Sequence, residues 1–171
     1  LNDEQPFNKL LVSLPDMKTQ FGLSAFTNQA TGVVSYSISV TFDENCDRLR
    51  DLCKRIDEHI VNTVADNSEE WLGQSYTPAE LTKALYNPLV KKGKDNYPDT
   101  LKIKVVSDAQ GNVIAPIFDK SYNEKYSSDL VGGSMVNCIV EIASIYFMGN
   151  KFGVSLRLDH VRLLPKAVRR H

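Results

Sequence analysis

The residues of this chain that could do chemistry are mainly lysines and tyrosines, and they gather between positions 86 and 126. Cations and aromatic rings alternate there: Tyr86, Lys91, Lys92, Lys94, Tyr97, Lys102, Lys104, Phe118, Lys120, Tyr122, Lys125 and Tyr126. Single-stranded nucleic acid needs this mixture, because rings stack on unpaired bases while cations follow the phosphates. Some of these rings must instead be core, and Phe118, within a strand pattern, is the first expected there.

Two further cations, Lys151 and Arg157, belong to the second of two strand-like segments that flank a tight loop at 148–153. The first segment, 135–147, has apolar or aromatic residues at both its odd-numbered and its even-numbered positions, which predicts a central strand covered on both faces. The second alternates apolar residues with Gly153, Ser155, Arg157 and Asp159, the pattern of a strand with one buried face. Its outer face is therefore free to meet a polyanion.

The formal net charge of −1 hides a segregation of charge along the chain. Residues 1–90 hold 7 Lys and Arg against 13 Asp and Glu, a balance of −6, whereas residues 91–171 hold 13 against 8, or +5. Local potential steers a phosphate backbone, so the C-terminal half could bind nucleic acid while the acidic half keeps the molecule soluble. Solvated surface alone would also produce such a split.

Catalytic patterns are poor in this sequence. Its 3 histidines form no H-E-x-x-H motif, and Gly132-Gly133-Ser134 lacks the spacing of a phosphate loop. Acidic side chains at Asp43, Glu44 and Asp47 stand near an expected helix start, where the macrodipole favours them; a metal-dependent nuclease is the third-ranked alternative. We expect a non-enzymatic protein without cofactor or metal.

The cysteines and the hydropathy pattern indicate which cellular compartment to expect. Cys46, Cys53 and Cys138 form no C-x-x-C pair and are odd in number, which is typical of free thiols in a cytosolic or nuclear protein. No apolar run of membrane-spanning length occurs, so we expect no membrane partner.

The order of expected elements is strands, a helical insertion, then four strands. Residues 1–32 form an N-terminal extension with strands, and 34–42 is an amphipathic strand. After that strand the apolar residues recur every three or four positions, which predicts a helix over about 44–66. The capping box at Thr77–Glu80 predicts the start of a second helix over about 78–86. Hairpins are expected at 101–118 and 135–164. Together, residues 1–171 are predicted to form one mixed-β domain, a small barrel or sandwich with the helical insertion 44–86.

Four segments give the chain a resemblance to a known family. The runs Leu85–Lys92, Tyr97–Val105, Val136–Phe147 and Lys151–Val154 resemble the single-stranded DNA-binding proteins of nucleocytoplasmic large DNA viruses. The likeness covers roughly residues 33–164, and that family is in turn similar to the single-strand binders of short-tailed bacteriophages.

This resemblance implies a five-stranded OB-fold barrel with the two helices packed outside it. It also implies sequence-tolerant binding of single-stranded DNA, with RNA as an open alternative, during viral DNA replication, recombination or repair in the host cytoplasm or nucleus. Replication proteins and a homo-oligomer are the other expected partners. The runner-up function is a protein-interaction or scaffold module of a replication complex. The expected nucleic-acid-binding residues are Tyr86, Lys91, Lys92, Lys94, Tyr97, Lys102, Lys104, Lys120, Tyr122, Lys125, Lys151 and Arg157.

Overall fold

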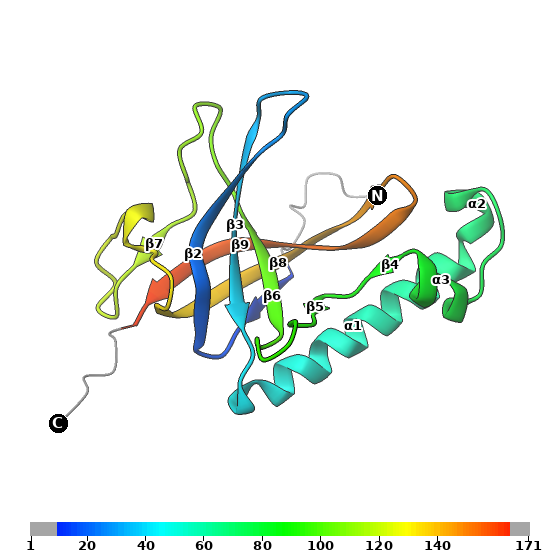
Figure 1. Cartoon of the computed structure of the whole chain (residues 1–171), viewed down its shortest axis with the longest axis horizontal. Coiled ribbons are helices and arrows are strands. Elements are labelled where there is room, and N and C mark those ends of the chain that lie inside the picture. The colour runs from blue at the N-terminus through cyan, green and yellow to red at the C-terminus, as the bar shows by residue number, and fades with distance from the viewer. Residues whose placement is uncertain (1–9, 165–171) are drawn as a thin grey trace, which may run out of the picture.

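Five long strands form the body of the molecule, as Figure 1 shows for this computed structural model, which describes residues 10–164. They are β2 (Met17–Thr27), β3 (Val34–Thr41), β6 (Thr100–Val105), β8 (Met135–Met148) and β9 (Lys151–Leu163). Hydrogen-bonded pairing runs from β2 to β3, β6, β9 and β8, and β8 pairs with β2 again, so the five strands close a ring. The β6–β9 step is parallel and the other four are antiparallel.

Four short strands extend this ring. The strand β1 (Leu11–Ser13) pairs with β8, and β5 (Val90–Lys91) pairs with β6. Two others, β4 (Tyr86–Asn87) and β7 (Ile117–Phe118), run parallel to β9 at its two ends. The observed β1 and β2 confirm the strands expected before residue 32, whereas the expectation of a single domain over 1–171 stays a prediction.

The strict alternation of β3 and β6 positions the core. Ile38 and Val40 on β3 point inward and are fully buried, as are the β6 residues Leu101 and Ile103. The residues between them, serines on β3 and lysines on β6, therefore lie on the outer side of the ring. Burial of the apolar set fixes the register, because a slip by one residue would place lysines in the core.

The helical insertion between β3 and β6 confirms the expected helix over 44–66. A short 3-10 turn, η1 (Glu44–Cys46), leads into α1 (Asp47–Asp66), and the Asp43 carboxylate caps it by accepting the Asn45 amide at 2.8 Å. Towards its start α1 packs on the main core, and towards its end it packs on a second cluster around Phe152.

The rest of the insertion departs from expectation in two places. A five-residue helix, α2 (Ser68–Leu72), was not predicted from the sequence, and it ends at Gly73 in the left-handed conformation. The capping box at Thr77 and Glu80 is confirmed at the start of α3 (Pro78–Ala84). That helix ends before Tyr86, because Tyr86 is already paired with Phe152 of β9.

The hairpin expected over 101–118 is wrong in its pairing, although its turn is present. The Asp108 carboxylate accepts the amides of Gln110 and Asn112, each at 2.9 Å, and one bridge joins Ser107 to Val113. Beyond that bridge the chain leaves β6, and β7 pairs with β9 instead. The reason is that β6 already has β3 on one edge and β5 and β9 on the other.

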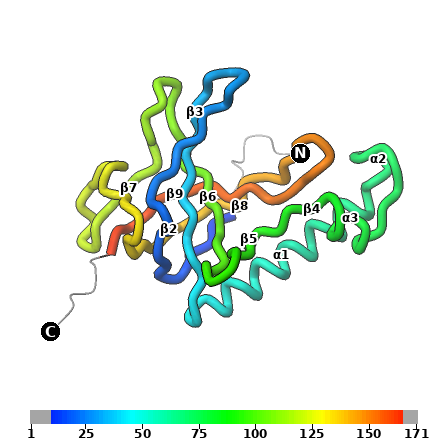
Figure 2. The backbone as a smooth tube through the Cα atoms, viewed as in Figure 1, coloured from blue at the N-terminus to red at the C-terminus, as the bar shows by residue number. Residues whose placement is uncertain are grey.

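The hairpin of β8 and β9 is confirmed, with a two-residue turn at Gly149 and Asn150. Its far half forms an arm that extends away from the ring (Figure 2). The prediction that both faces of the first strand are covered fails on this arm, where Phe147 is 51% exposed and Met148 is 75% exposed. The ring covers only the part of β8 that lies within it.

Candidate nucleic-acid interface

Five cations lie on the outer side of neighbouring strands and form what we call the lysine face. Its members are exposed or half-exposed and come from β2, β5, β6 and β9: Lys18, Lys91, Lys102, Lys104 and Arg157. Sequence reasoning identified four of them and missed Lys18, which stands alone on a strand far from the basic stretch. What brings them together is the pairing of β2 with β3, of β3 with β6, and of β6 with β5 and β9.

Strand register shows how the face is built. Across one row, Ser37 of β3 is paired with Lys104 of β6, which is paired with Arg157 of β9. The next row pairs Ser39 with Lys102. Because neighbouring strands lie about 4.8 Å apart, cations and hydroxyls alternate at a spacing close to the reach of a single phosphate.

The third row closes the lower end of the face. Lys18 is paired with Thr41, Thr41 with Thr100, and Thr100 with Lys91. Thr100 is buried, so the accessible polar groups of this row are the lysine ammonium groups at its two ends and the Thr41 hydroxyl. Both kinds of group bind phosphate oxygens without reading bases.

A cleft of about 360 Å³ lies at the upper end of the face. It opens between the β3 and β6 strand ends and the β8–β9 arm, and its lining includes Ser35, Tyr36, Lys104, Ser107, Ser144 and Arg157. Hydroxyls and two cations make this lining suited to an anionic, hydrogen-bonding ligand such as a nucleotide of a strand.

Arg157 is held in place by a carboxylate beneath it. Its Nη2 donates to Glu141 Oε1 at 2.7 Å, and Glu141 is 8% exposed while the Arg157 side chain is 47% exposed. This pair partly neutralises Arg157 and orients its guanidinium, whereas no ion pair involves Lys102 or Lys104 within the described part of the chain. Lys102 and Lys104 therefore add full positive charges to the potential of the face.

Two aromatic residues that sequence reasoning missed also lie on this side of the sheet. Phe26 is 69% exposed and is paired with Ser35 of β3. Tyr146 lies across Gly153, where a Cβ would meet the tyrosine hydroxyl at 2.7 Å, and this hydroxyl accepts a hydrogen bond from Asn87 at 3.1 Å. A lone glycine inside a strand marks such a close approach, so Gly153 was the available signal.

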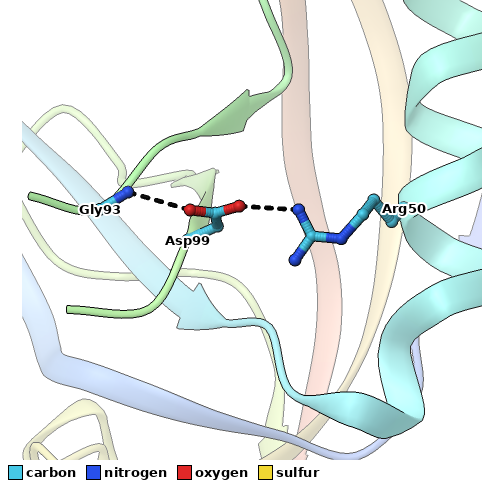
Figure 3. A network of polar contacts seen from close by, with 3 residues as sticks. All are labelled: Arg50, Gly93 and Asp99. Carbon is cyan, nitrogen blue, oxygen red and sulfur yellow. Dashed lines mark hydrogen bonds and ion pairs between the residues drawn. The ribbon is translucent and has the colours of Figure 1, made fainter. Parts of the chain in front are cut away.

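The basic loop 92–98 joins β5 to β6 at the lower end of the face, and Figure 3 shows the contacts of Asp99 that fix it. Asp99 accepts the Gly93 amide at 3.0 Å and the Arg50 guanidinium at 2.7 Å, and these bonds, Arg50 first, hold the pKa of Asp99 below its usual value. Anchored in this way, the loop exposes the predicted Lys92, Lys94 and Tyr97 to solvent, Tyr97 by 66%.

The other predicted residues fall outside the face. Lys120, Tyr122 and Lys125 flank β7, which pairs with the end of β9, while Lys151 begins β9 at the tip of the arm. Figure 1 shows β7 and the tip of the arm at opposite sides of the molecule.

Tyr86 was wrongly assigned to the interface. It is 6% exposed, packs on Phe152 with ring centroids 5.1 Å apart, and donates its hydroxyl proton to Asp57 of α1. Burial, reinforced by this hydrogen bond, raises the pKa of Tyr86. The ring is inaccessible to a base because α1 and α3 enclose it in the second core cluster.

Nucleophilic and metal chemistry find little support in the geometry. Burial raises the pKa of Cys53 to about 11 and that of Cys138 to about 12, so both thiols stay protonated at neutral pH. Asp43, the first residue of the acidic cluster, is used as a helix cap. Across residues 10–164, no three His, Cys, Asp or Glu side chains gather as metal ligands would.

Comparison with known proteins adds to this geometry. The fold is similar to that of a single-stranded DNA-binding protein from bacteriophage Enc34, solved as a C-terminal truncation, with a TM-score of 0.57 and 10% sequence identity. The alignment covers 94% of this chain and 88% of the phage chain. No curated protein matches the sequence, and no helix in the described portion is long and apolar enough to cross a membrane. A family model matches residues 32–170, and the chain therefore belongs to that family, the family of unknown function DUF5871.

Proposed function

We propose that this chain is a non-enzymatic OB-fold protein that binds single-stranded DNA along the lysine face. The closed ring of β2, β3, β6, β9 and β8 supports the barrel assignment, and so does the similarity in fold to the phage protein. OB-folds bind oligonucleotides on the face of their second and third strands, between two loops. Here those strands are β3 and β6, which carry the serine and lysine rows.

The observation that carries the proposal is the row Ser37, Lys104 and Arg157 at the mouth of the cleft. Cations and hydroxyls recur across the strands, and these groups recognise phosphate and sugar rather than base edges. The expected binding is therefore sequence-tolerant and salt-dependent. Exposed Phe26 and Tyr97 supply rings on which bases of any identity can stack.

The biological setting of the proposal rests on the resemblance drawn from the sequence. We assign the protein to the covering of exposed strands during viral DNA replication, recombination or repair, in the manner of the single-strand binders of nucleocytoplasmic large DNA viruses. Contacts with replication proteins, self-association and a place of action in the host cytoplasm or nucleus belong to the same proposal.

A fluorescence anisotropy titration tests the function directly. Labelled single-stranded DNA of mixed sequence, the matching duplex, and single-stranded RNA are each titrated with the intact chain. We expect saturable binding of the single strands with similar affinity for different sequences, and weaker binding of the duplex. The RNA arm measures any preference for one sugar, which depends on contact with the 2′-hydroxyl.

The same titration separates this function from the runner-up. A scaffold module that uses its basic surface for an acidic protein has no reason to prefer a single strand over a duplex. Equal or undetectable binding of all three nucleic acids at low salt would therefore refute the proposal and favour the protein-interaction module.

A further inference from the structure

A second cluster of aromatic and cationic side chains surrounds β7, outside the lysine face, and we call it the β7 station. Its members come from β7, the following loop and the end of β9: Phe118, Lys120, Tyr122, Lys125, His160 and Arg162. Phe118 lies 6.3 Å from the rings of both Tyr122 and His160, so it packs beneath them. The buried side of the station is thus formed by packed aromatic rings.

Tyr122 is held in an exposed position by two contacts with Arg162. The guanidinium lies 5.3 Å from the centre of the ring, and its Nη1 donates to the tyrosine hydroxyl at 3.0 Å. Nevertheless the ring is 64% exposed. Within residues 10–164 the buried Nε of Arg162 has no hydrogen-bond partner, and no carboxylate forms an ion pair with this guanidinium. Its positive charge is therefore available to an anion.

The backbone of the loop gives an independent sign of a specialised position. Tyr122 has φ of 65°, a left-handed conformation that costs about 1–3 kcal/mol for a bulky residue. The Asp119 carboxylate enforces it by accepting the amides of Ser121 and Asn123 at 2.8 and 2.9 Å. Asparagine or glycine would adopt this conformation with less strain, so turn chemistry alone does not select a tyrosine at this position.

The outer side of β9 connects the two regions. Leu158 and Val161 point into the core, which leaves Arg157 at the lysine face and Arg162 at the β7 station on the outside of the same strand. Arg162 follows Arg157 by five residue steps of strand, about 16 Å. A bound strand needs only a few nucleotides to span that distance, within the roughly 4–16 nucleotides that one OB-fold covers.

We propose that the β7 station is a second contact point for the strand bound on the lysine face. A base stacks on Tyr122, and Lys120 and Lys125 hold the adjoining phosphates. This inference rests on the proposed function, since it assigns a longer path to the same ligand. DNA strands long enough to reach from Arg157 past Arg162 should therefore bind more tightly than shorter ones.

The test is a length series of oligothymidylates from four to sixteen nucleotides, titrated against the intact chain and against Tyr122→Asn. Asparagine removes the ring together with its contacts to Phe118 and Arg162, but it suits the left-handed backbone, so the melting temperature should change little. We expect the longest strand to lose about 5- to 150-fold in affinity for the variant, the range of one base stack, while the shortest strand is unaffected. Longer oligonucleotides offer more overlapping binding positions and so bind more tightly to any variant. Comparing the variant with the wild type at each length removes this statistical effect.

Two controls keep the result interpretable. Trp71→Ala removes a half-exposed ring from α2, at the other side of the molecule in Figure 1, and should leave every length unaffected. Lys104→Gln should weaken all lengths together. If Tyr122→Asn matches the wild type at every length while Lys104→Gln weakens binding, the station is refuted and the proposed function stands. If no oligothymidylate binds the wild type, the proposed function itself fails.

Discussion

Removing two central charges from the lysine face gives the sharpest test of where phosphates bind. Lys102 and Lys104 are exposed neighbours on the outer side of β6. Each phosphate contact lowers log affinity for a single strand by about 0.7 per unit of log salt. The five contacts of the lysine face therefore contribute about −3.5 to the slope, and the three that remain in the double variant Lys102→Gln, Lys104→Gln contribute about −2.1. Contacts outside the face add equally to both slopes.

These slopes translate into a plain difference in affinity. Between 50 and 200 mM salt, the contacts of the lysine face should cost the wild type about 130-fold in affinity and the double variant only about 20-fold. The assay is anisotropy of a labelled sixteen-nucleotide strand at four salt concentrations across that range. The double variant should also bind more weakly than the wild type at 50 mM, where the missing contacts matter most.

A matched control removes the same charge from the helical insertion. Lys54 of α1 and Lys83 of α3 are exposed and lie off the lysine face, so Lys54→Gln, Lys83→Gln changes net charge equally. Its slope should equal that of the wild type. An unchanged slope in the β6 variant would show that phosphates do not contact these two lysines. The same reduced slope in both variants would show that overall charge, and not this face, determines binding.

Three other features give measurable outcomes. Burial raises the pKa of Asp57, and Tyr86 donates a hydrogen bond to this carboxylate. Tyr86→Phe removes that donor, so the free energy of unfolding should fall by about 1.5–3 kcal/mol at neutral pH. Without that donor the pKa of Asp57 rises further, so the stability difference between variant and wild type should shrink as pH falls through this pKa. Urea melts at several pH values measure it, and a difference that stays constant with pH would contradict the prediction. Gly153→Ala should displace the Tyr146 ring and weaken single-strand binding, with little change in stability because alanine favours strand by about 0.5–1 kcal/mol. Finally, DNA incubated with magnesium or manganese should stay intact on a gel, and nicking abolished by Asp43→Asn would restore the nuclease alternative.

Local patterns predicted the elements well wherever one physical term dominated. The alternation of Ser35 to Thr41, the apolar stripe of α1 and the capping box at Thr77 each describe short-range chemistry, and the structure confirms all three. The short helix α2 escaped prediction because its five residues contain too little periodicity to detect.

Pairing and exposure could not be predicted in the same way, because they depend on which strand edges are already occupied. β7 pairs with β9 since both edges of β6 are filled, and nothing within residues 101–118 reports on that. Phe147 looked like core by its strand pattern, yet its end of β8 lies on the arm. Tyr86 looked available because it precedes basic residues, yet α1 and α3 cover it.

The candidate site shows the same division. Lysines in alternation on β6 were readable from sequence, since a polar residue between two buried ones must face outward. Lys18, Phe26 and Tyr146 joined them only through strand pairing, which places residues that are distant in the chain on neighbouring strands. Interfaces spread over a sheet are therefore only half visible in sequence, because their members are neighbours in register and not in the chain.

The near-neutral charge of the chain is compatible with binding a polyanion because the fold separates its charges. The 20 residues of α1 span about 30 Å, so α2, with Glu69 and Glu70, is carried to the far end of that helix from the ring. Exposed charges are screened beyond a Debye length of about 8 Å at physiological salt. Acidic residues at that distance reduce the net charge of the molecule while leaving the potential over Lys102 and Lys104 almost unchanged. Glu69 and Glu70 thus lower the net charge without weakening the lysine face, which is why a formal charge of −1 is compatible with the proposed binding of a polyanion.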